Sequence, residues 1–274
     1  MADEPDQGLL LGRNVPPVDR YAPELLHAIA RAEGRDRLGL SGEPPFSGVD
    51  TWHAYELSWL DGEGVPQVAV GRFSVPAESP HMVESKSLKL YLNSLNNTRF
   101  DSADAFRCTL EVDLAAVVDA PVSVELLGVD AADLAGNPPP GDCLDGLAVP
   151  VPAGEPSAVM LAAGEGVDVE ESLYTHLLRS LCPVTGQPDW ATLWLRYRGP
   201  TLDRRALLSY LLAFRNHREY HEQCVERIFI DVLTSCRPVS LQVQGLYTRR
   251  GGLDINPYRS SAAGGEPLAR LNRQ

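Results

Sequence analysis

One short segment of the sequence, Cys182 to Asp189, places a thiol and a carboxylate at the two ends of a loop that contains two prolines. A cysteine can act as a nucleophile, and a carboxyl group seven residues away across a turn can protonate the atom on which charge develops after the attack. Such an acid must carry its proton beforehand, and burial favours the neutral form of a carboxyl group. The alternative interpretation is a buried structural cysteine, which is the usual role of a free thiol.

Two segments must position this loop. Proline fixes φ and cannot continue a helix, so we expect the segment that begins near Val169 to end at Cys182 and to expose the thiol to a pocket. Residues 190–197 then have the composition of a strand. The thiol and the carboxylate are therefore expected at one end of a stiff connection.

Internal repetition indicates two copies of one structural unit. Residues 71–76 match residues 195–200 at an offset of 124, and residues 121–128 match residues 238–245 at an offset of 117. The order is kept, and small drifts in offset are what loop insertions produce.

Each copy is predicted to contain a strand, two helices and a second strand. Apolar alternation at Val239, Leu241 and Val243 suits a sheet that packs under helices on one face. The expected ranges are 68–75, 87–96, 102–118 and 122–128 in the first copy, and 192–197, 204–215, 220–234 and 240–247 in the second. The sequence thus predicts an α+β fold of two tandem modules with antiparallel sheets. The predicted modules are residues 1–135 and 171–274, joined by a Gly-, Pro- and acid-rich connection over 136–170.

Four motifs carry a resemblance to a known family. They are C-P-V-T-G-Q-P-D-W at 182–190, E-S-K-S-L-K-L-Y-L-N-S at 84–94, H-E-Q-C at 221–224 and R-R-G-G-L-D-I-N-P at 249–257. In this combination and order the chain resembles the long, two-module NADPH-dependent 7-cyano-7-deazaguanine reductases, the nitrile reductases of queuosine biosynthesis. The resemblance implies the tunnelling fold, in which antiparallel sheets with helices on one face assemble into a barrel, and a homo-oligomer, specifically a homodimer.

The chemistry that the resemblance implies uses three catalytic residues. Cys182 adds to the nitrile to form a covalent thioimide, and Asp189 donates the proton to its nitrogen. His221 assists protonation of the imine or orients the substrate. Because reduction of a nitrile to the primary amine takes four electrons, two NADPH are needed per turnover. We expect one active centre per chain, because the first copy has no equivalent of Cys182.

A deazaguanine presents a ring N–H and an exocyclic amine, and a carboxylate can accept both with two oxygens in one plane. Glu222 and Glu84 are the candidates in this sequence. The substrate-binding residues implied by the resemblance are Val83, Glu84, Ser85, His221 and Glu222.

For the dinucleotide, Lys86 and Lys89 share one face at the start of a helix, where phosphate oxygens also meet backbone N–H groups. Glycines after Arg250 permit close approach of the backbone. The predicted cofactor-binding residues are Ser85, Lys86, Lys89, Arg250 and Gly251. The sequence has no G-x-G-x-x-G motif after a strand, so a Rossmann-type site is not expected.

Composition limits the partners. The formal charge of −13 disfavours a general nucleic-acid binder, and no apolar run reaches the roughly 18 residues of a membrane span. Residues 1–20 lack the apolar core of a signal peptide. The five cysteines are unclustered, which disfavours a disulfide framework and a zinc ribbon. We therefore expect a cytoplasmic enzyme without a metal that binds a small deazapurine, with no direct nucleic-acid or membrane partner.

Three other functions remain open from the residues. A tunnelling-fold cyclohydrolase needs zinc, and the six histidines have no C-x-x-C partner. Another cysteine-dependent enzyme, peroxidatic or acyl-transferring, would use Cys182 without a nicotinamide. A non-catalytic purine-binding module would leave Cys182 structural.

Overall fold

The computed structural model describes residues 18–262 and 265–274, and for residues 165–167 the backbone alone. The expectation that the N-terminus carries no signal peptide falls largely on residues 1–17, outside the described residues. The chain forms two compact units, each built from separate segments. Within the described residues, the first unit comprises 18–34, 50–134 and 249–254, and the second comprises 35–49, 135–262 without 249–254, and 265–274.

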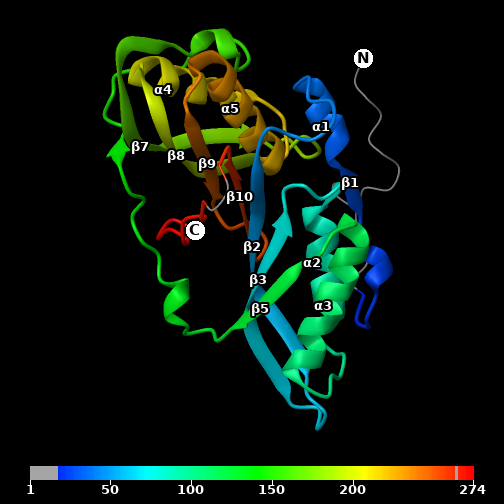
Figure 1. Cartoon of the computed structure of the whole chain (residues 1–274). Helices are drawn as coiled ribbons and strands as arrows, with labels where there is room; N and C mark the ends of the chain where they lie inside the picture. The colour runs from blue at the N-terminus through cyan, green and yellow to red at the C-terminus, as the bar shows by residue number, and fades with distance from the viewer. Residues whose placement is uncertain (1–17, 263–264) are drawn as a thin grey trace. The chain divides into compact units, whose positions relative to one another are not determined.

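The first unit holds a three-stranded arrangement in the order β5-β3-β2 and a separate antiparallel pair, β1 and β4. Strands β3 and β5 are antiparallel, with Val70 opposite Leu127. Helices α2 and α3 lie on one side of these strands (Figure 1). The bounds are β1 Ala28–Ala30, β2 Ser47–Leu60, β3 Pro66–Pro76, β4 His81–Val83, α2 Ser85–Ser94, α3 Ala103–Val118 and β5 Ser123–Leu127.

The second unit has its strands in the order β10-β9-β8-β7-β6. Neighbouring strands are antiparallel from β10 to β7, and only the short β6 runs parallel to β7. Helices α4 and α5 lie together on one side of this sheet (Figure 1). The bounds are β6 Asp142–Cys143, β7 Ala163–Leu181, β8 Pro188–Leu202, α4 Arg204–Ala213, α5 His221–Cys236 and β9 Ser240–Tyr247. This unit also includes the last three residues of α1 Arg31–Arg37 and the last six of β10 Leu253–Ser260. Short 3-10 turns occupy Pro23–Leu25, Ala132–Leu134, Ala158–Met160 and Phe214–Asn216.

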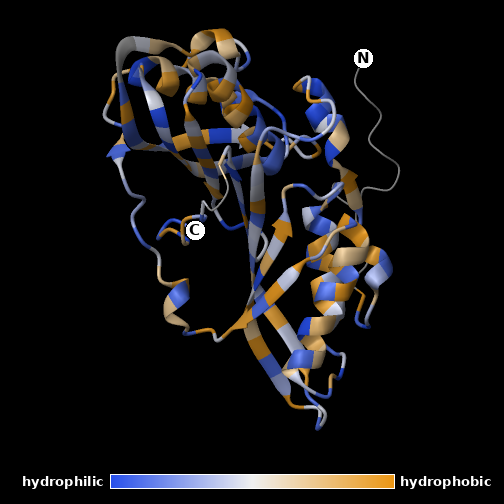
Figure 2. Ribbon diagram, in the orientation of Figure 1, coloured by the Kyte–Doolittle hydropathy of each residue, from blue (hydrophilic) through white to orange (hydrophobic). Residues whose placement is uncertain are grey.

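Apolar stripes explain why the helices pack on the strands. In α3 the buried residues Phe106, Leu110, Leu114 and Val118 recur every four positions and so form one face. Figure 2 shows that apolar and polar residues are interspersed along β2, β3 and β5. Burial of each large apolar side chain stabilises the fold by about 1.5–3 kcal/mol relative to leaving it exposed.

The second face of the β8–β10 sheet is also covered. Trp194 of β8, Leu246 of β9 and Tyr258 of β10 form a buried cluster with Leu271 near the C-terminus. The C-terminal segment is held there by Gln274, whose amide donates to the carbonyl of Tyr247 at 3.0 Å. Strands β8 and β9 are therefore packed on both faces, by helices on one side and by the C-terminal segment on the other.

Corresponding interactions confirm the internal repeat. Helices α2 and α4 each have ten residues and are capped at the N-terminus by carboxylates of Glu84 and Asp203. The hydroxyl of Tyr91 in α2 donates to Asp113 in α3 at 2.5 Å, and that of Tyr210 in α4 donates to Asp231 in α5 at 2.7 Å. Antiparallel strands with two helices on one face in each unit confirm the predicted α+β class. Among the described residues, no helix combines the length and apolarity needed to cross a membrane.

Candidate active site

The hairpin between β7 and β8 places the two groups of the predicted site on one face. Its end is closed by two hydrogen bonds, from the Cys182 amide to the carbonyl of Gln187 and from the Gly186 amide to the carbonyl of Cys182, both 2.9 Å. Ser180 is directly opposite Asp189 in the ladder. Opposed residues share a face, and residues two apart on a strand share it too. The Cys182 and Asp189 side chains are therefore on the same side of the hairpin.

Helix α5 covers this side and supplies the third group. Nε2 of His221, its first residue, lies 3.3 Å from Oδ2 of Asp189. The imidazole stacks on the ring of Tyr247, with the centroids 3.9 Å apart and the planes at 22°. Tyr247 is itself opposite Ala191, two residues beyond Asp189. The structure therefore brings Asp189 and His221 into contact, and stacking on Tyr247 fixes the orientation of the imidazole.

The thiol of Cys182 is buried, with 3% of the residue exposed. The amide of Thr185 lies 3.5 Å from Sγ and donates to it. Gly186 has φ +68°, a left-handed conformation that favours glycine and closes the loop. The thiol that this loop could expose is therefore buried within the chain.

Two further residues of the H-E-Q-C motif, Glu222 and Cys224, lie on the same helix. Glu222 lies in the first turn of α5 and is buried, where the positive end of the helix dipole favours a carboxylate. Cys224 is fully buried, and burial raises the pKa of its thiol well above the ordinary value. Both Cys182 and Cys224 are free thiols. An inert, protonated Cys224 fits this environment.

The remaining predicted site residues belong to the first unit. Val83 is buried in β4 opposite Ala28. Glu84 is buried and caps α2, because its carboxylate accepts the amides of Lys86 at 2.8 Å and Ser87 at 2.7 Å. Those two N–H groups are therefore already satisfied. The expected contact between a phosphate and these two backbone amides is therefore wrong, because the carboxylate of Glu84 already accepts both N–H groups.

Lys89 and Gly251 do come together. Residues 250–253 form a tight turn in which Arg250 and Leu253 exchange backbone hydrogen bonds, and Gly251 and Gly252 have φ of +61° and +81°. A Cβ on Gly251 would stand 3.3 Å from Nζ of Lys89, so the absence of a side chain makes room for this amine.

A pocket of about 240 Å³ lies at this place. Its lining includes Lys89 and Gly251 together with Glu56, Asn93 and Asn96, which the sequence analysis did not single out. Nζ of Lys89 also lies 3.8 Å from a carboxylate oxygen of Glu56. The lining thus offers a cation, a carboxylate and two amides next to exposed backbone.

Sequence reasoning also missed Tyr247. It stands at the end of β9, and nothing in its neighbourhood along the chain points to His221, which is 26 residues earlier. The register of β9 and the placement of α5 bring the two rings together. Burial raises the pKa of the Tyr247 hydroxyl well above its ordinary value, so this residue is a neutral support.

Comparisons with known proteins cover nearly the whole chain. A family model described as "Nitrile reductase, 7-cyano-7-deazaguanine-reductase N-term" matches residues 18–126, and one described as "QueF-like protein" matches residues 188–265. The crystal structure of the archaeosine synthase QueF-Like in the apo form aligns with 38% of this chain and all of its own, at 18% identity and a TM-score of 0.31. The two structures are therefore only distantly similar.

Two relatives are much nearer. The chain is 54% identical over 260 residues to the NADPH-dependent 7-cyano-7-deazaguanine reductase of Xanthomonas campestris pv. campestris (strain B100), covering 94% of both chains. It is 51% identical over 271 residues to the protein of the same name from Bordetella pertussis, covering 96% of this chain and 97% of that one. On motifs, modules and relatives together, the chain belongs to the family of NADPH-dependent 7-cyano-7-deazaguanine reductases.

Proposed function

We propose that this chain uses NADPH to reduce the nitrile of 7-cyano-7-deazaguanine to the primary amine of 7-aminomethyl-7-deazaguanine, in queuosine biosynthesis, through a thioimide on Cys182. The observation that carries the proposal is the shared face of the β7–β8 hairpin. It holds Cys182 and Asp189, and Asp189 is in contact with His221. A nucleophile with a positioned acid is what addition to a nitrile needs.

The proposed reaction is an addition to the nitrile followed by two hydride transfers. The sulfur of Cys182 forms a bond to the nitrile carbon, the thiol proton is released, and Asp189 protonates the nitrogen, which gives a thioimide. Hydride from one NADPH adds to the same carbon. Expulsion of the thiolate leaves an imine, and hydride from a second NADPH with one further proton gives the amine. His221 lies 3.3 Å from Asp189 and can return the proton that Asp189 has given away.

Recognition of the substrate is assigned to Glu222 and Glu84, with Val83, Ser85 and His221. Glu222 follows His221 directly, so it shares the first turn of α5 with the catalytic imidazole. Each carboxylate oxygen has two acceptor sites, so Glu84 can cap α2 and still accept from a ligand. The buried position of both glutamates suits a hydrogen bond that is stronger than one in water.

The dinucleotide is assigned to Ser85, Lys86, Lys89, Arg250 and Gly251. The pocket beside Lys89 and Gly251 supports this assignment, since it joins an amine to a turn of two glycines. Phosphate oxygens would be met by the side chains of Lys86, Lys89 and Arg250, because Glu84 occupies the amides at the start of α2. A reducing cytoplasm is the proposed location, supported by five free cysteines.

The test is intact-protein mass spectrometry after mixing the enzyme with 7-cyano-7-deazaguanine in the absence of NADPH. Addition loses no atom, so wild type should gain the full mass of the substrate, and NADPH should discharge it. Cys182→Ala should gain nothing, whereas Cys224→Ala, which removes the other buried thiol of this region, should still form the adduct. Absence of an adduct on wild type that binds the substrate by calorimetry would leave a purine-binding module as the better account.

A further inference from the structure

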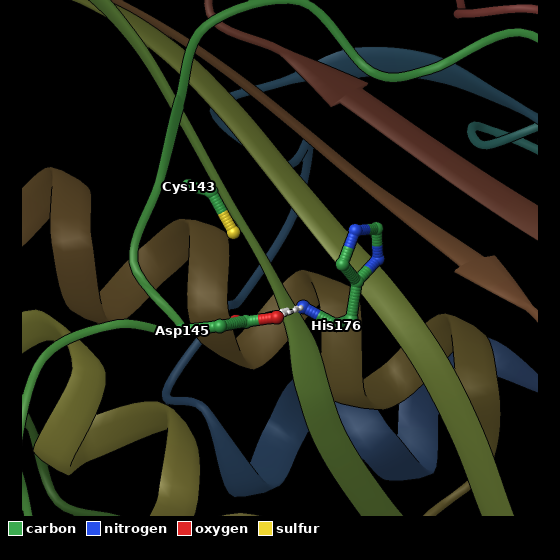
Figure 3. Close-up of side chains that lie close together, drawn as sticks. All are labelled: Cys143, Asp145 and His176. Carbon is green, nitrogen blue, oxygen red and sulfur yellow. Dashed lines mark hydrogen bonds between the residues drawn. The ribbon is translucent and has the colours of Figure 1, made fainter.

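A second group of chemically active side chains lies in the second unit, outside the residues assigned to the reaction. Cys143 at the end of β6, Asp145 two residues later and His176 in β7 have ligand atoms that all lie within 4.8 Å of one another. Figure 3 shows the three side chains around one space, with a hydrogen bond from the His176 amide to Asp145. The parallel pairing of β6 with β7, which sets Cys143 opposite Tyr174, produces this meeting.

Hydrogen bonds hold Asp145 in place. Oδ1 accepts the hydroxyl of Thr175 at 2.6 Å and the amide of His176 at 3.1 Å. These contacts anchor the carboxylate on β7 although Asp145 itself follows β6. An oxygen restrained in this way loses little freedom when it binds a cation.

The imidazole of His176 is oriented as well. Its Nδ1 lies 2.8 Å from Oγ1 of Thr192, a buried residue of β8. When Nδ1 donates to that hydroxyl, Nε2 carries the free lone pair. Metal-binding histidines in proteins use their other nitrogen in this manner, with a hydrogen bond that fixes tautomer and ring.

A second carboxylate, Asp142, lies at the same end of β6. It forms an ion pair with Arg204 at 2.8 Å, so Asp145 is the carboxylate of this group that can accept a cation.

We propose that Cys143, Asp145 and His176 form a binding site for a divalent transition metal, with Zn²⁺ as the preferred ion and water as the fourth ligand. Thiolate, imidazole and carboxylate are the three ligand types of zinc, whereas Mg²⁺ and Ca²⁺ take oxygen ligands. Donor atoms around tetrahedral zinc are roughly 3.5 Å apart. The three side chains need to move by about 1 Å to reach that geometry from a separation of up to 4.8 Å.

The ligands come from two distant parts of the unit. A bound ion would tie the start of the segment between β6 and β7 to the sheet, since Asp145 is followed by 17 residues before β7 begins at Ala163. The function of the site is therefore structural. The expectation that the protein binds no metal was based on the absence of closely spaced ligand motifs in the sequence. Asp145 and His176 are 31 residues apart, so no such motif could indicate this site.

The proposal is tested with Co²⁺ as a spectroscopic substitute for zinc on the full chain, after removal of metals with a chelator. Wild type should bind one Co²⁺ per chain with visible bands of a tetrahedral ion and a sulfur-to-cobalt charge-transfer band. Cys143→Ser should lose the charge-transfer band, and Asp145→Asn and His176→Gln should weaken binding. Cys108→Ser, which removes the other exposed cysteine, should leave the spectrum unchanged. The proposal is overturned if wild type gives no such spectrum, or if the charge-transfer band is lost in Cys182→Ala and kept in Cys143→Ser.

A second measurement does not depend on the thiol. Excess Zn²⁺ should raise the Tm of wild type, because an ion that binds only the folded state stabilises it, and should not raise that of His176→Gln. Thr192→Val removes the hydrogen bond that orients the ring and should lower the affinity for Co²⁺ by about 10-fold to 100-fold. Equal responses of wild type, His176→Gln and Thr192→Val would contradict the site.

Discussion

Among single residues, Asp189 has the most restricted setting. It is buried on a strand that is packed on both faces, and Nε2 of His221 lies 3.3 Å from its carboxylate. The imidazole cannot turn away easily because it stacks on Tyr247. A proton can therefore pass between these two side chains without a change of rotamer.

Asp189→Asn should slow formation of the covalent adduct by roughly 100-fold to 10,000-fold, the usual contribution of a positioned acid or base. The amide keeps the shape of the carboxyl group but cannot donate an acidic proton to the nitrile nitrogen. Quenched-flow mass spectrometry with the substrate alone measures this rate. Asp168→Asn, the same change at an exposed position of β7, should have no effect. An unchanged rate in Asp189→Asn would show that another group supplies the proton.

A comparison of variants at Glu84 and Asp203 distinguishes helix capping from recognition of the substrate. The two carboxylates cap the corresponding helices α2 and α4, and Gln or Asn keeps a capping oxygen, so Glu84→Gln and Asp203→Asn should each cost less in urea unfolding than the roughly 0.5–2 kcal/mol of a change to alanine. Only Glu84 is assigned to the substrate. Loss of a charge-assisted hydrogen bond of about 1.5–3 kcal/mol should weaken substrate binding by Glu84→Gln roughly 10-fold to 150-fold. Calorimetry in a Cys182→Ala background measures this affinity. Equal affinities in the two variants would make Glu84 a cap alone.

At the scale of elements, helix α5 carries both residues proposed to act in the reaction and a buried ion-pair cluster. Its first turn carries His221 and Glu222, and one turn later Glu226 is buried between two arginines. Arg35 donates to both oxygens of Glu226, at 3.0 and 2.9 Å, and Arg259 donates to Oε1 at 3.1 and 2.9 Å. Both guanidinium groups also lie 5.5 Å from the ring of Phe46. This cluster fixes α5 against α1 and β10 within the second unit.

Glu226→Gln should destabilise the protein by about 3–5 kcal/mol, because it leaves the charges of two buried arginines without their carboxylate. Urea unfolding followed by tryptophan fluorescence measures the loss. The control is Glu170→Gln, which breaks the exposed pair with Arg196 and should cost less than about 1 kcal/mol. Equal losses in the two variants would mean that the buried cluster does not hold α5.

The residues just before α5 give a pH dependence. Burial alone would lower the pKa of His217, but hydrogen bonds to Glu219 and Glu155 raise it above 6.5. Burial likewise acts against Glu219, yet Arg227 and His217 lower the pKa of that carboxyl group. A histidine with a raised pKa in the folded state adds stability that is complete below its unfolded value and is lost as the pH rises through the folded value.

Wild type should therefore exceed His217→Asn in stability by more at pH 5.5 than at pH 8.5. The comparison is the difference in urea midpoint between the two proteins at each pH, since other titrating groups cancel in it. A difference that does not change with pH, or one that grows toward alkaline pH, would contradict the charged state of His217 in the folded protein.

At the scale of the whole molecule, the formal charge of −13 keeps the surface acidic, so phosphate-binding cations must be local. The side chains proposed to meet the dinucleotide, Lys86, Lys89 and Arg250, all belong to the first unit. Those proposed to act on the nitrile, Cys182, Asp189 and His221, all belong to the second. Substitutions of the first set are therefore expected to change the KM for NADPH, and substitutions of the second set are expected to change the rate of adduct formation.

The tunnelling fold builds barrels from several modules, so two modules in one chain predict a homodimer. Light scattering coupled to size exclusion should give twice the chain mass of 29.8 kDa over a range of loading concentrations. Measurement in low and in high salt is the control for association through charge. A mass of one chain under all these conditions would contradict the prediction.

Much of this organisation is determined by sequence over short distances. The helix expected at 102–118 is observed as Ala103–Val118 with Ser102 as its cap, and the strand expected at 240–247 is observed as Ser240–Tyr247. Their periodicity and capping signals are local. One prediction from local alternation was wrong. Val239 was expected on the apolar face of the strand, but it is 60% exposed because it precedes β9. The motifs around Cys182, Glu84 and His221 were sufficient for the family, since they are contiguous.

Only the tertiary structure decided which distant residues meet. Tyr247 lies under His221, Glu226 lies between Arg35 and Arg259, and His176 lies beside Cys143. Residues separated by 26 to 191 positions meet in these groups, and no pattern of period two or period 3.6 relates them. Helix and strand periodicity is written in neighbouring residues, whereas these contacts depend on strand register and helix placement. Those are set by the packing of the whole unit, and therefore the folded structure was needed to find them.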